Sequence, residues 1–109
     1  MTNNRACSNK ALILETLKRS TPVFQALGDV NRQQIIALLL EQTSLNVNQI
    51  TERMAISRPA ISHHLKILRQ ADLIEYNRVG KEKYYSLSSN IRQALQPIKE
   101  LLLAVEDGP

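Results

Sequence analysis

Aromatic residues are scarce in this chain, with no Trp, one Phe and three Tyr among 109 residues. The interior must therefore be built from aliphatic side chains, mostly Leu and Ile, and this favours helices over a sheet sandwich. A chain of this length with 43% hydrophobic residues is sufficient for one packed core and too apolar for a disordered segment. The composition predicts a single, mainly helical domain.

Cysteine and long apolar runs are nearly absent as well. Cys7 is the only cysteine, which excludes an intramolecular disulfide framework and fits a reducing compartment. No apolar run approaches the roughly 20 residues that span a bilayer, and the polar start "MTNNRACSNK" lacks the apolar core of a signal peptide. We therefore expect a cytoplasmic protein without a membrane partner.

Basic residues are in excess and unevenly placed. The net charge is +4 and the sequence pI about 9.5, a balance typical of domains that bind polyanions. Residues 57–87 contain six of the 14 Lys and Arg residues but three of the ten acidic residues. A modest excess of this kind also has a simpler explanation, which is solubility. The positions of the basic residues have to decide between polyanion binding and solubility.

The apolar periodicity predicts one compact unit after a flexible N-terminal arm at residues 1–9. Helices are expected over about 10–19, 22–27, 30–42, 47–54, 57–71 and 90–106. The first two are separated by a break at "STP", and the second should bury Phe24 and Leu27. Residues 73–87 alternate as two strands around Gly80, which is typical of a hairpin. Residues 10–109 thus form one α+β domain in the order α-α-α-α-α-β-β-α.

The fourth and fifth helices resemble a helix-turn-helix over about residues 47–71. A three-residue turn ending at Ser57 leads into a helix whose apolar residues Ile61, Leu65 and Leu68 form one stripe. Ser57 can cap that helix, and Pro59 stands where a missing N–H costs little. The opposite face is basic and hydrogen-bonding, as a helix that enters the major groove of DNA requires.

A basic hairpin directly after such a helix completes a winged helix-turn-helix, with the wing over about 73–87. The candidate DNA-binding residues on the recognition helix and the wing are Ser57, Arg58, Pro59, Ser62, His63, His64, Lys66, Arg69, Arg78, Lys81 and Lys83. His63 projects toward the DNA side. His64 lies nearer the apolar stripe, so DNA contact and a partly buried packing role are equally open for it.

The segments "ALGDVNRQQIIALLL" and "ISRPAISHHLKILRQADLIEYNRVGKEKYYSL" resemble the ArsR/SmtB family of bacterial winged-helix repressors over about residues 22–88. The resemblance implies a homodimer that binds an operator with inverted-repeat character and releases it when an effector binds. It also implies a dimer interface formed by the terminal helices, at about 10–19 and 90–106. The interface candidates, whose spacing in the last helix is heptad-like, are Leu14, Leu17, Ile91, Leu95, Ile98, Leu102 and Val105. Packing of the last helix on its own domain is the alternative.

The chain departs from the family at the metal-sensing positions. Many members carry Cys-x-Cys in the helix before the recognition helix, where this chain has Asn46 and Asn48. Other members use Asp, Glu and His on the last helix, which here has no His and only Glu100 and Glu106 as carboxylates. Asparagine is a poor ligand for the ions concerned. We therefore expect no metal site, no cofactor and an effector of unknown identity.

Other classes of protein remain as alternatives. No Ser-His-Asp set, carboxylate pair or Gly-rich phosphate loop is present, which argues against an enzyme. A winged-helix module that binds protein instead of DNA is the main competitor, because a fold does not fix a function. A redox-sensing repressor that uses the Cys7 thiol is a further possibility. The competing interpretation is that Cys7 is an incidental thiol without a function.

Overall fold

The computed structural model describes the backbone of residues 2–106 and the side chains of residues 10–106. Its elements, in chain order, are α1 (Thr2–Leu27), α2 (Val30–Gln42), β1 (Leu45–Asn46), α3 (Val47–Glu52), α4 (Arg58–Gln70), β2 (Ile74–Val79), β3 (Glu82–Leu87) and α5 (Ile91–Glu106). The strands form one antiparallel sheet in the order β1-β3-β2. This is the predicted winged helix-turn-helix. No helix in the described range is long and apolar enough to cross a membrane.

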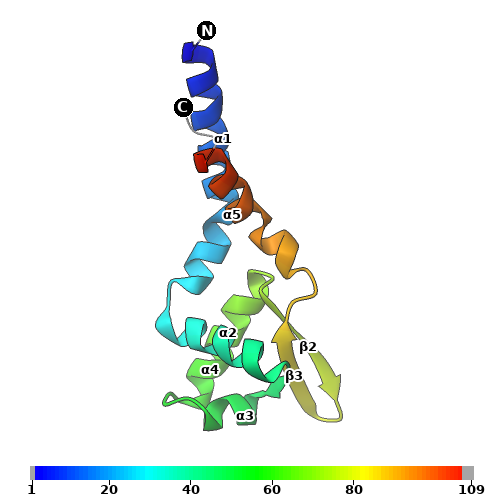
Figure 1. Ribbon diagram of the computed structural model, residues 1–109. Coiled ribbons are helices and arrows are strands. Elements are labelled where there is room, and N and C mark those ends of the chain that lie inside the picture. Colours follow the sequence, from blue (N-terminus) through cyan, green and yellow to red (C-terminus); the bar gives the residue numbers. More distant parts are fainter. Residues whose placement is uncertain (1, 107–109) are drawn as a thin grey trace.

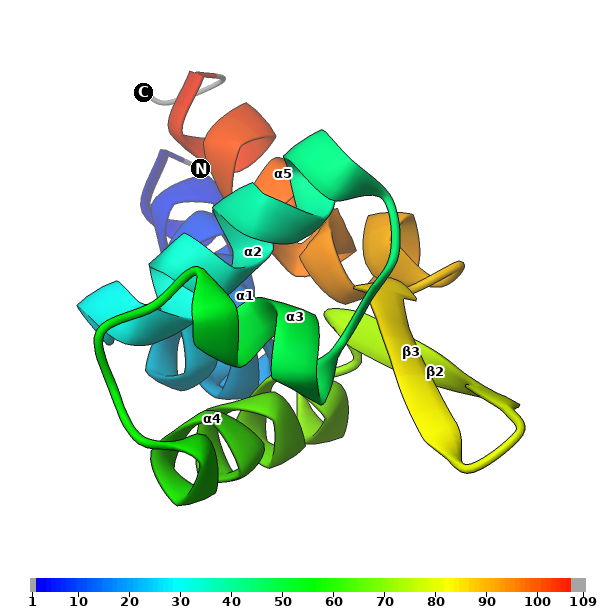
Figure 2. The ribbon, with the colours of Figure 1, turned by 90° about the horizontal axis from the view of Figure 1, so that it is seen from below.

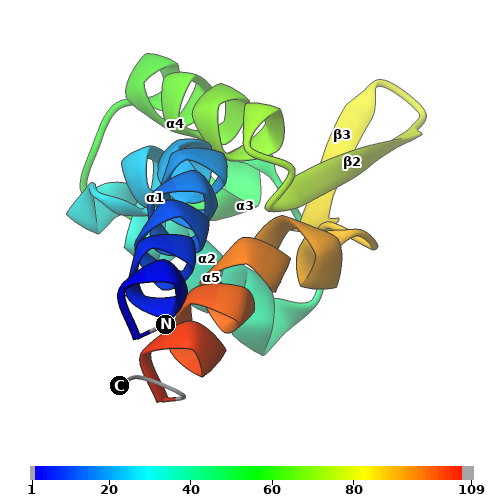
Figure 3. The same cartoon turned by 90° about the horizontal axis from the view of Figure 1, so that it is seen from above.

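The molecule is elongated, with principal extents of 61 × 24 × 20 Å. Helices α1 and α5 pack side by side and form a stalk, and the chain's two ends lie toward the far end of it (Figures 1 and 3). Helices α2, α3 and α4 and the β2–β3 hairpin form a head at the other end (Figure 1). The stalk and the head therefore present separate surfaces to solvent.

The core of the head is aliphatic, as the lack of aromatic residues predicted. Its fully buried side chains come from α2, α3, α4 and the start of β2: Ile35, Leu39, Ile50, Ile61, Leu65, Leu68, Leu73 and Ile74. Three of these are the predicted apolar stripe of α4, so one side of that helix is fixed on the core. The other side is left free for a function.

Local signals at the helix ends are confirmed. The Asp29 carboxylate accepts hydrogen bonds from the amides of Asn31 and Arg32 at the start of α2. Ser57 Oγ accepts one from the amide of Ala60 at 3.4 Å, and Pro59 stands in the first turn of α4. These caps satisfy amides that have no partner within their own helix. They fix where α2 and α4 begin.

The predicted break at "STP" is wrong, because α1 continues through Pro22 and merges the first two expected helices into one. Pro22 removes one backbone hydrogen bond, but α1 packs against α5 and against α2 and α4 of the head, and it stays continuous. Ser20 Oγ donates to the Thr16 carbonyl at 2.8 Å, and Thr21 Oγ1 donates to the Leu17 carbonyl at 3.2 Å. Thr16 and Ser20 are buried. Tertiary packing thus overrides the local preference for a break.

Three further differences follow from packing. Phe24, expected to be buried, is 43% exposed, since α1 turns Val23 and Ala26 toward the core instead. Helix α1 includes residues 2–9, for which the sequence predicted a flexible arm. The two-residue strand β1 was not expected, and it exists because Leu45 pairs with Tyr85 of β3. The observed order is therefore α-α-β-α-α-β-β-α, with one helix fewer and one strand more than predicted.

Candidate nucleic-acid interface

The free side of α4 carries cationic and hydroxyl side chains. Arg58, Ser62, Lys66 and Arg69 are exposed, while the stripe on the opposite side is fully buried. The first turn of the helix adds the positive end of its dipole. A helix anchored on one side and basic on the other can present these donors to a polyanion without rearranging.

Helix α4 and the wing together line a groove of about 430 Å³. Figure 2 shows α4 and the β2–β3 hairpin next to each other at the end of the head. Seven predicted DNA-binding residues line this groove: Arg58, Ser62, Lys66, Arg69, Arg78, Lys81 and Lys83. Val47, Glu82 and Tyr85 also line it and were not predicted. Glu82 is the one acidic side chain among six cations in this lining.

The wing concentrates positive charge at a narrow tip. Gly80 adopts a left-handed φ of +64°, which closes the turn between β2 and β3. Arg78 pairs directly with Lys83 across the two strands. Like charges in this position repel each other, so an anion such as a phosphate that binds between them would relieve the repulsion.

Several cations are held in place by neighbours that sequence reasoning missed. Arg58 Nη1 donates to Asn48 Oδ1 of α3 at 2.6 Å. Arg69 and Lys83 lie over the Tyr76 ring, at 5.4 Å and 4.7 Å from its centroid. These cation–π contacts order the side chains but leave their charges accessible at the groove. Sequence periodicity carried no signal for either contact, because each joins separate elements.

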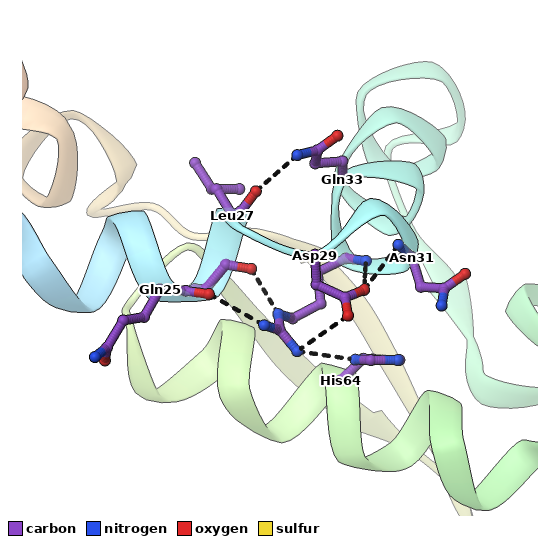
Figure 4. Close-up of polar contacts among 8 residues, drawn as sticks. Gln25, Leu27, Asp29, Asn31, Gln33 and His64 are labelled. Carbon is purple, nitrogen blue, oxygen red and sulfur yellow. Dashed lines mark hydrogen bonds and ion pairs between the residues drawn. The ribbon is translucent and has the colours of Figure 1, made fainter.

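Four predicted residues lie outside this lining. Ser57 and Pro59 shape the start of α4, as described above. His63 is exposed on α4. His64 is partly buried, and its Nδ1 lies 3.1 Å from Arg32 Nη1 of α2 (Figure 4).

The electrostatic environment is consistent with a surface built for anions. Burial raises the pKa of the Tyr85 phenol in the groove, so its hydroxyl stays protonated and able to donate. At the base of the wing, the amide of Ser89 donates to Glu75 Oε1 and lowers the pKa of that carboxyl. Glu75 is thereby tied to the start of α5 and does not line the groove.

The positions used for metals in other members have other roles here. Asn46 forms a capping box with Gln49 at the start of α3, and Asn48 binds Arg58. Glu100 pairs with Arg19 of α1 at 2.6 Å. Within the described part of the chain, no three His, Cys, Asp or Glu side chains stand close enough to hold a metal ion. The side chain of Cys7 lies outside the described residues.

The dimer candidates divide into two groups along the stalk. Ile91, Leu95 and Ile98 are partly buried and pack against the core of their own domain. The other four are exposed: Leu14, Leu17, Leu102 and Val105. Helix α5 continues through Pro97 and ends with Leu102, Leu103 and Val105 uncovered. The far part of the stalk therefore has an apolar surface that the other described residues leave exposed.

Comparison with known proteins supports the assignment of the fold. A family model described as "Bacterial regulatory protein, arsR family" matches residues 29–76, which include α2, α3, α4 and the start of the wing. The transcriptional repressor SdpR of Bacillus subtilis is 42% identical over 71 residues, covering 65% of this chain and 78% of the relative. A transcriptional repressor SmtB homolog of Synechocystis sp. is 35% identical over 86 residues, covering 79% of this chain and 64% of the relative.

A solved structure agrees with these relatives. The ArsR-like transcriptional regulator from Rhodococcus sp. RHA1 superimposes with a TM-score of 0.72 at 28% identity, covering 86% of this chain and 85% of that one. The matched proteins are transcriptional regulators and not enzymes. With a basic groove on a winged helix and relatives of this similarity, the chain belongs to the ArsR/SmtB family of DNA-binding transcriptional regulators.

Proposed function

We propose that the chain is a repressor that binds an inverted-repeat operator in double-stranded DNA as a homodimer. The observation that carries this proposal is the groove between α4 and the wing, which gathers six cations and Ser62 from two elements around one acidic side chain. A surface that served only solubility would mix basic and acidic side chains, and it would not concentrate hydrogen-bond donors in one groove. The arrangement suits a duplex, whose backbone offers regularly spaced phosphates and whose major groove accepts a helix.

The two parts of the groove have different tasks in this proposal. Helix α4 enters the major groove, where Ser62, Lys66 and Arg58 face base edges and the adjacent phosphates. The hydrogen bond that Arg58 donates to Asn48 keeps its side chain near the groove wall and ready for such a contact. The wing places Lys81 and its neighbours on the DNA backbone or in the minor groove.

The stalk supports the homodimer. Leu14, Leu17, Leu102 and Val105 leave an apolar surface on two helices that are already packed together. A second copy is a suitable cover, because it would bury the same surface on both protomers under two-fold symmetry. Two recognition helices held in this way would read half-sites about one helical turn, roughly 34–36 Å, apart.

The proposal includes an effector other than a metal ion. Asn46 and Asn48 supply no thiolates, and their side chains are used for the cap of α3 and for Arg58. Soft or borderline ions bind such amide oxygens weakly. Operator affinity measured with zinc, cadmium or arsenite should equal the affinity in chelator, and release by any of them would contradict this part.

A titration of labelled operator fragments tests the main proposal. Fragments from the region upstream of the chain's own gene are compared with scrambled duplexes at several salt concentrations. Ser62→Ala and Lys66→Ala should weaken binding to the operator more than to the scrambled duplex, because base contacts carry the specificity. Lys10→Ala, which changes charge on the stalk, is the matched control. A protein that ignores every duplex at low salt would be the protein-binding module instead.

The redox alternative is tested separately. Non-reducing electrophoresis before and after peroxide would reveal an intersubunit disulfide through Cys7. If oxidation releases the operator from the wild type but not from Cys7→Ser, the thiol is the sensor. Equal responses in both proteins would remove that alternative.

A further inference from the structure

Arg32 is a nearly enclosed cation at the junction of three helices, away from the DNA groove. Its side chain is 14% exposed and contacts the end of α1 and the middle of α4 (Figure 4). Nε donates to the Ala26 carbonyl at 2.6 Å, and Nη2 donates to the Gln25 carbonyl at 3.1 Å. Nη1 meets His64 Nδ1 of α4 at 3.1 Å. One guanidinium thus joins the end of α1, the start of α2 and the middle of α4.

Side-chain hydrogen bonds at the end of α1 fix the junction between α1 and α2. The last carbonyls of a helix lack partners within it. Here Arg32 binds two of them, and Gln33 Nε2 donates to a third, that of Leu27, at 2.8 Å. Asp29 accepts the first amides of α2 and lies 4.0 Å from Arg32 Nη1. The stalk helix and α2 therefore meet in a rigid joint.

His64 connects this joint to the recognition helix. Arginine has no acceptor, so its N–H must donate and Nδ1 of His64 must accept, which requires a neutral ring with its proton on Nε2. At 100° per residue, His64 lies roughly 160° around α4 from both Ser62 and Lys66. It is also absent from the lining of the groove. His64 faces the joint and cannot reach the DNA that Ser62 and Lys66 face.

We propose that His64 is a positioning residue for DNA recognition, which links α4 to the stalk through Arg32. This inference rests on the proposed function and deepens it. Because the stalk carries the dimer surface, the link fixes the angle of each recognition helix relative to the dimer axis. Loss of the link leaves α4 on its hydrophobic core but less firmly oriented. The dimer would then bind its operator more weakly and tolerate altered half-site spacing.

The test compares two substitutions at the same position. His64→Leu keeps the volume but removes the acceptor, whereas His64→Asn places Oδ1 close to the position of Nδ1. We expect His64→Leu to weaken operator binding about ten-fold, the scale of one hydrogen bond to a charged group, and His64→Asn to restore most of it. His64→Leu should also discriminate less between the correct operator and one with two base pairs inserted between its half-sites. The slope of binding against salt should not change, because no phosphate contact is lost.

A spectroscopic measurement tests the link in the free protein. Long-range ¹H–¹⁵N correlation of the imidazole should show His64 with Nε2 protonated and Nδ1 as acceptor, and Arg32→Lys should alter that signature. Thermal unfolding of Arg32→Lys, His64→Leu and the double variant should show coupling, with the double variant scarcely less stable than the worse single one.

Each result has a defined consequence. Wild-type binding by His64→Leu, equal weakness of His64→Asn, a reduced salt slope or an Nδ1–H tautomer would overturn the positioning role. If the wild type binds no duplex at all, the proposed function fails instead. The tautomer and the coupling in unfolding still decide whether the Arg32–His64 link exists.

Discussion

Lys81 at the tip of the wing offers the sharpest quantitative test of the DNA-binding surface. It follows Gly80 in the turn, its side chain is exposed, and it lines the groove with the cations of α4. Among the described side chains, the ion pairs involve other residues. Lys81→Ala should therefore remove a charge that is free for a phosphate without disturbing a contact inside the protein.

The expected magnitude follows from counterion release. Each phosphate neutralised on duplex DNA contributes about 0.9 to the slope of log affinity against log salt. In a homodimer the substitution removes two such contacts, so the slope should become less steep by about 1.8. When the salt is raised from 50 to 200 mM, the factor by which Lys81→Ala loses operator affinity should be roughly twelve-fold smaller than the factor for the wild type.

Fluorescence anisotropy of one labelled operator at five or more salt concentrations measures this slope. Lys10→Ala carries the same change in charge, but on α1, whose N-terminal part lies at the opposite end of the molecule from the wing (Figure 1). Its slope should match the wild type. An unchanged slope for Lys81→Ala, or an equal drop for Lys10→Ala, would refute the idea that the wing contacts the backbone. A drop of about 0.9 would mean that one wing of the dimer makes the contact.

Three other substitutions test the stalk, a cap and the core. Leu102→Asp puts a charge on a side chain that is 57% exposed on α5, and light scattering should find monomers with at least ten-fold weaker operator binding; a stable dimer would contradict the interface. Burial would raise the pKa of Asp29, but the amides of Arg32 and Asn31 and the positive charge of Arg32 lower it below its ordinary value. The ionised cap therefore stabilises the fold fully above about pH 4, and it stabilises the fold less as the pH falls through the folded pKa. In urea unfolding, the free energy of unfolding should fall less between about pH 5 and pH 2.5 for Asp29→Asn than for the wild type. Equal losses in the two proteins would refute this. Leu65→Ala should lower the free energy of unfolding by about 2–5 kcal/mol, and a loss below about 1 kcal/mol would show that the α4 stripe is not packed as described.

The sequence predicted best those parts of the fold that are set by local patterns. The stripe of α4, its Ser57 cap and the alternation around Gly80 are all properties of neighbouring residues, and each is confirmed. The continuity of α1 is not local. Pro22 and two hydroxyl residues read as a break, yet α1 continues through them, with Ser20 buried, because it packs against other helices of the fold.

The same division applies to the candidate site. The cations of the groove were predictable because they project from one helix face and one hairpin tip. Asn48, Tyr76 and Arg32 were missed because each acts on a residue of another element: Arg58, Lys83 and His64. Such contacts depend on the packing of helices and strands, which periodicity does not encode. In the sequence, Asn48 is notable only because it stands where related proteins carry a metal ligand.

That position shows how one place in the fold can serve different purposes. In the metal-sensing pattern described above, the start of the helix before α4 carries the cysteines that bind an ion. Here Asn46 closes the cap of α3 and Asn48 holds Arg58 directly. Cysteines at both positions would therefore remove a cap and release Arg58 before any metal bound. If the effector is not a metal ion, as proposed, the Arg32–His64 link to the stalk is a contact through which regulation can reach α4 from another side.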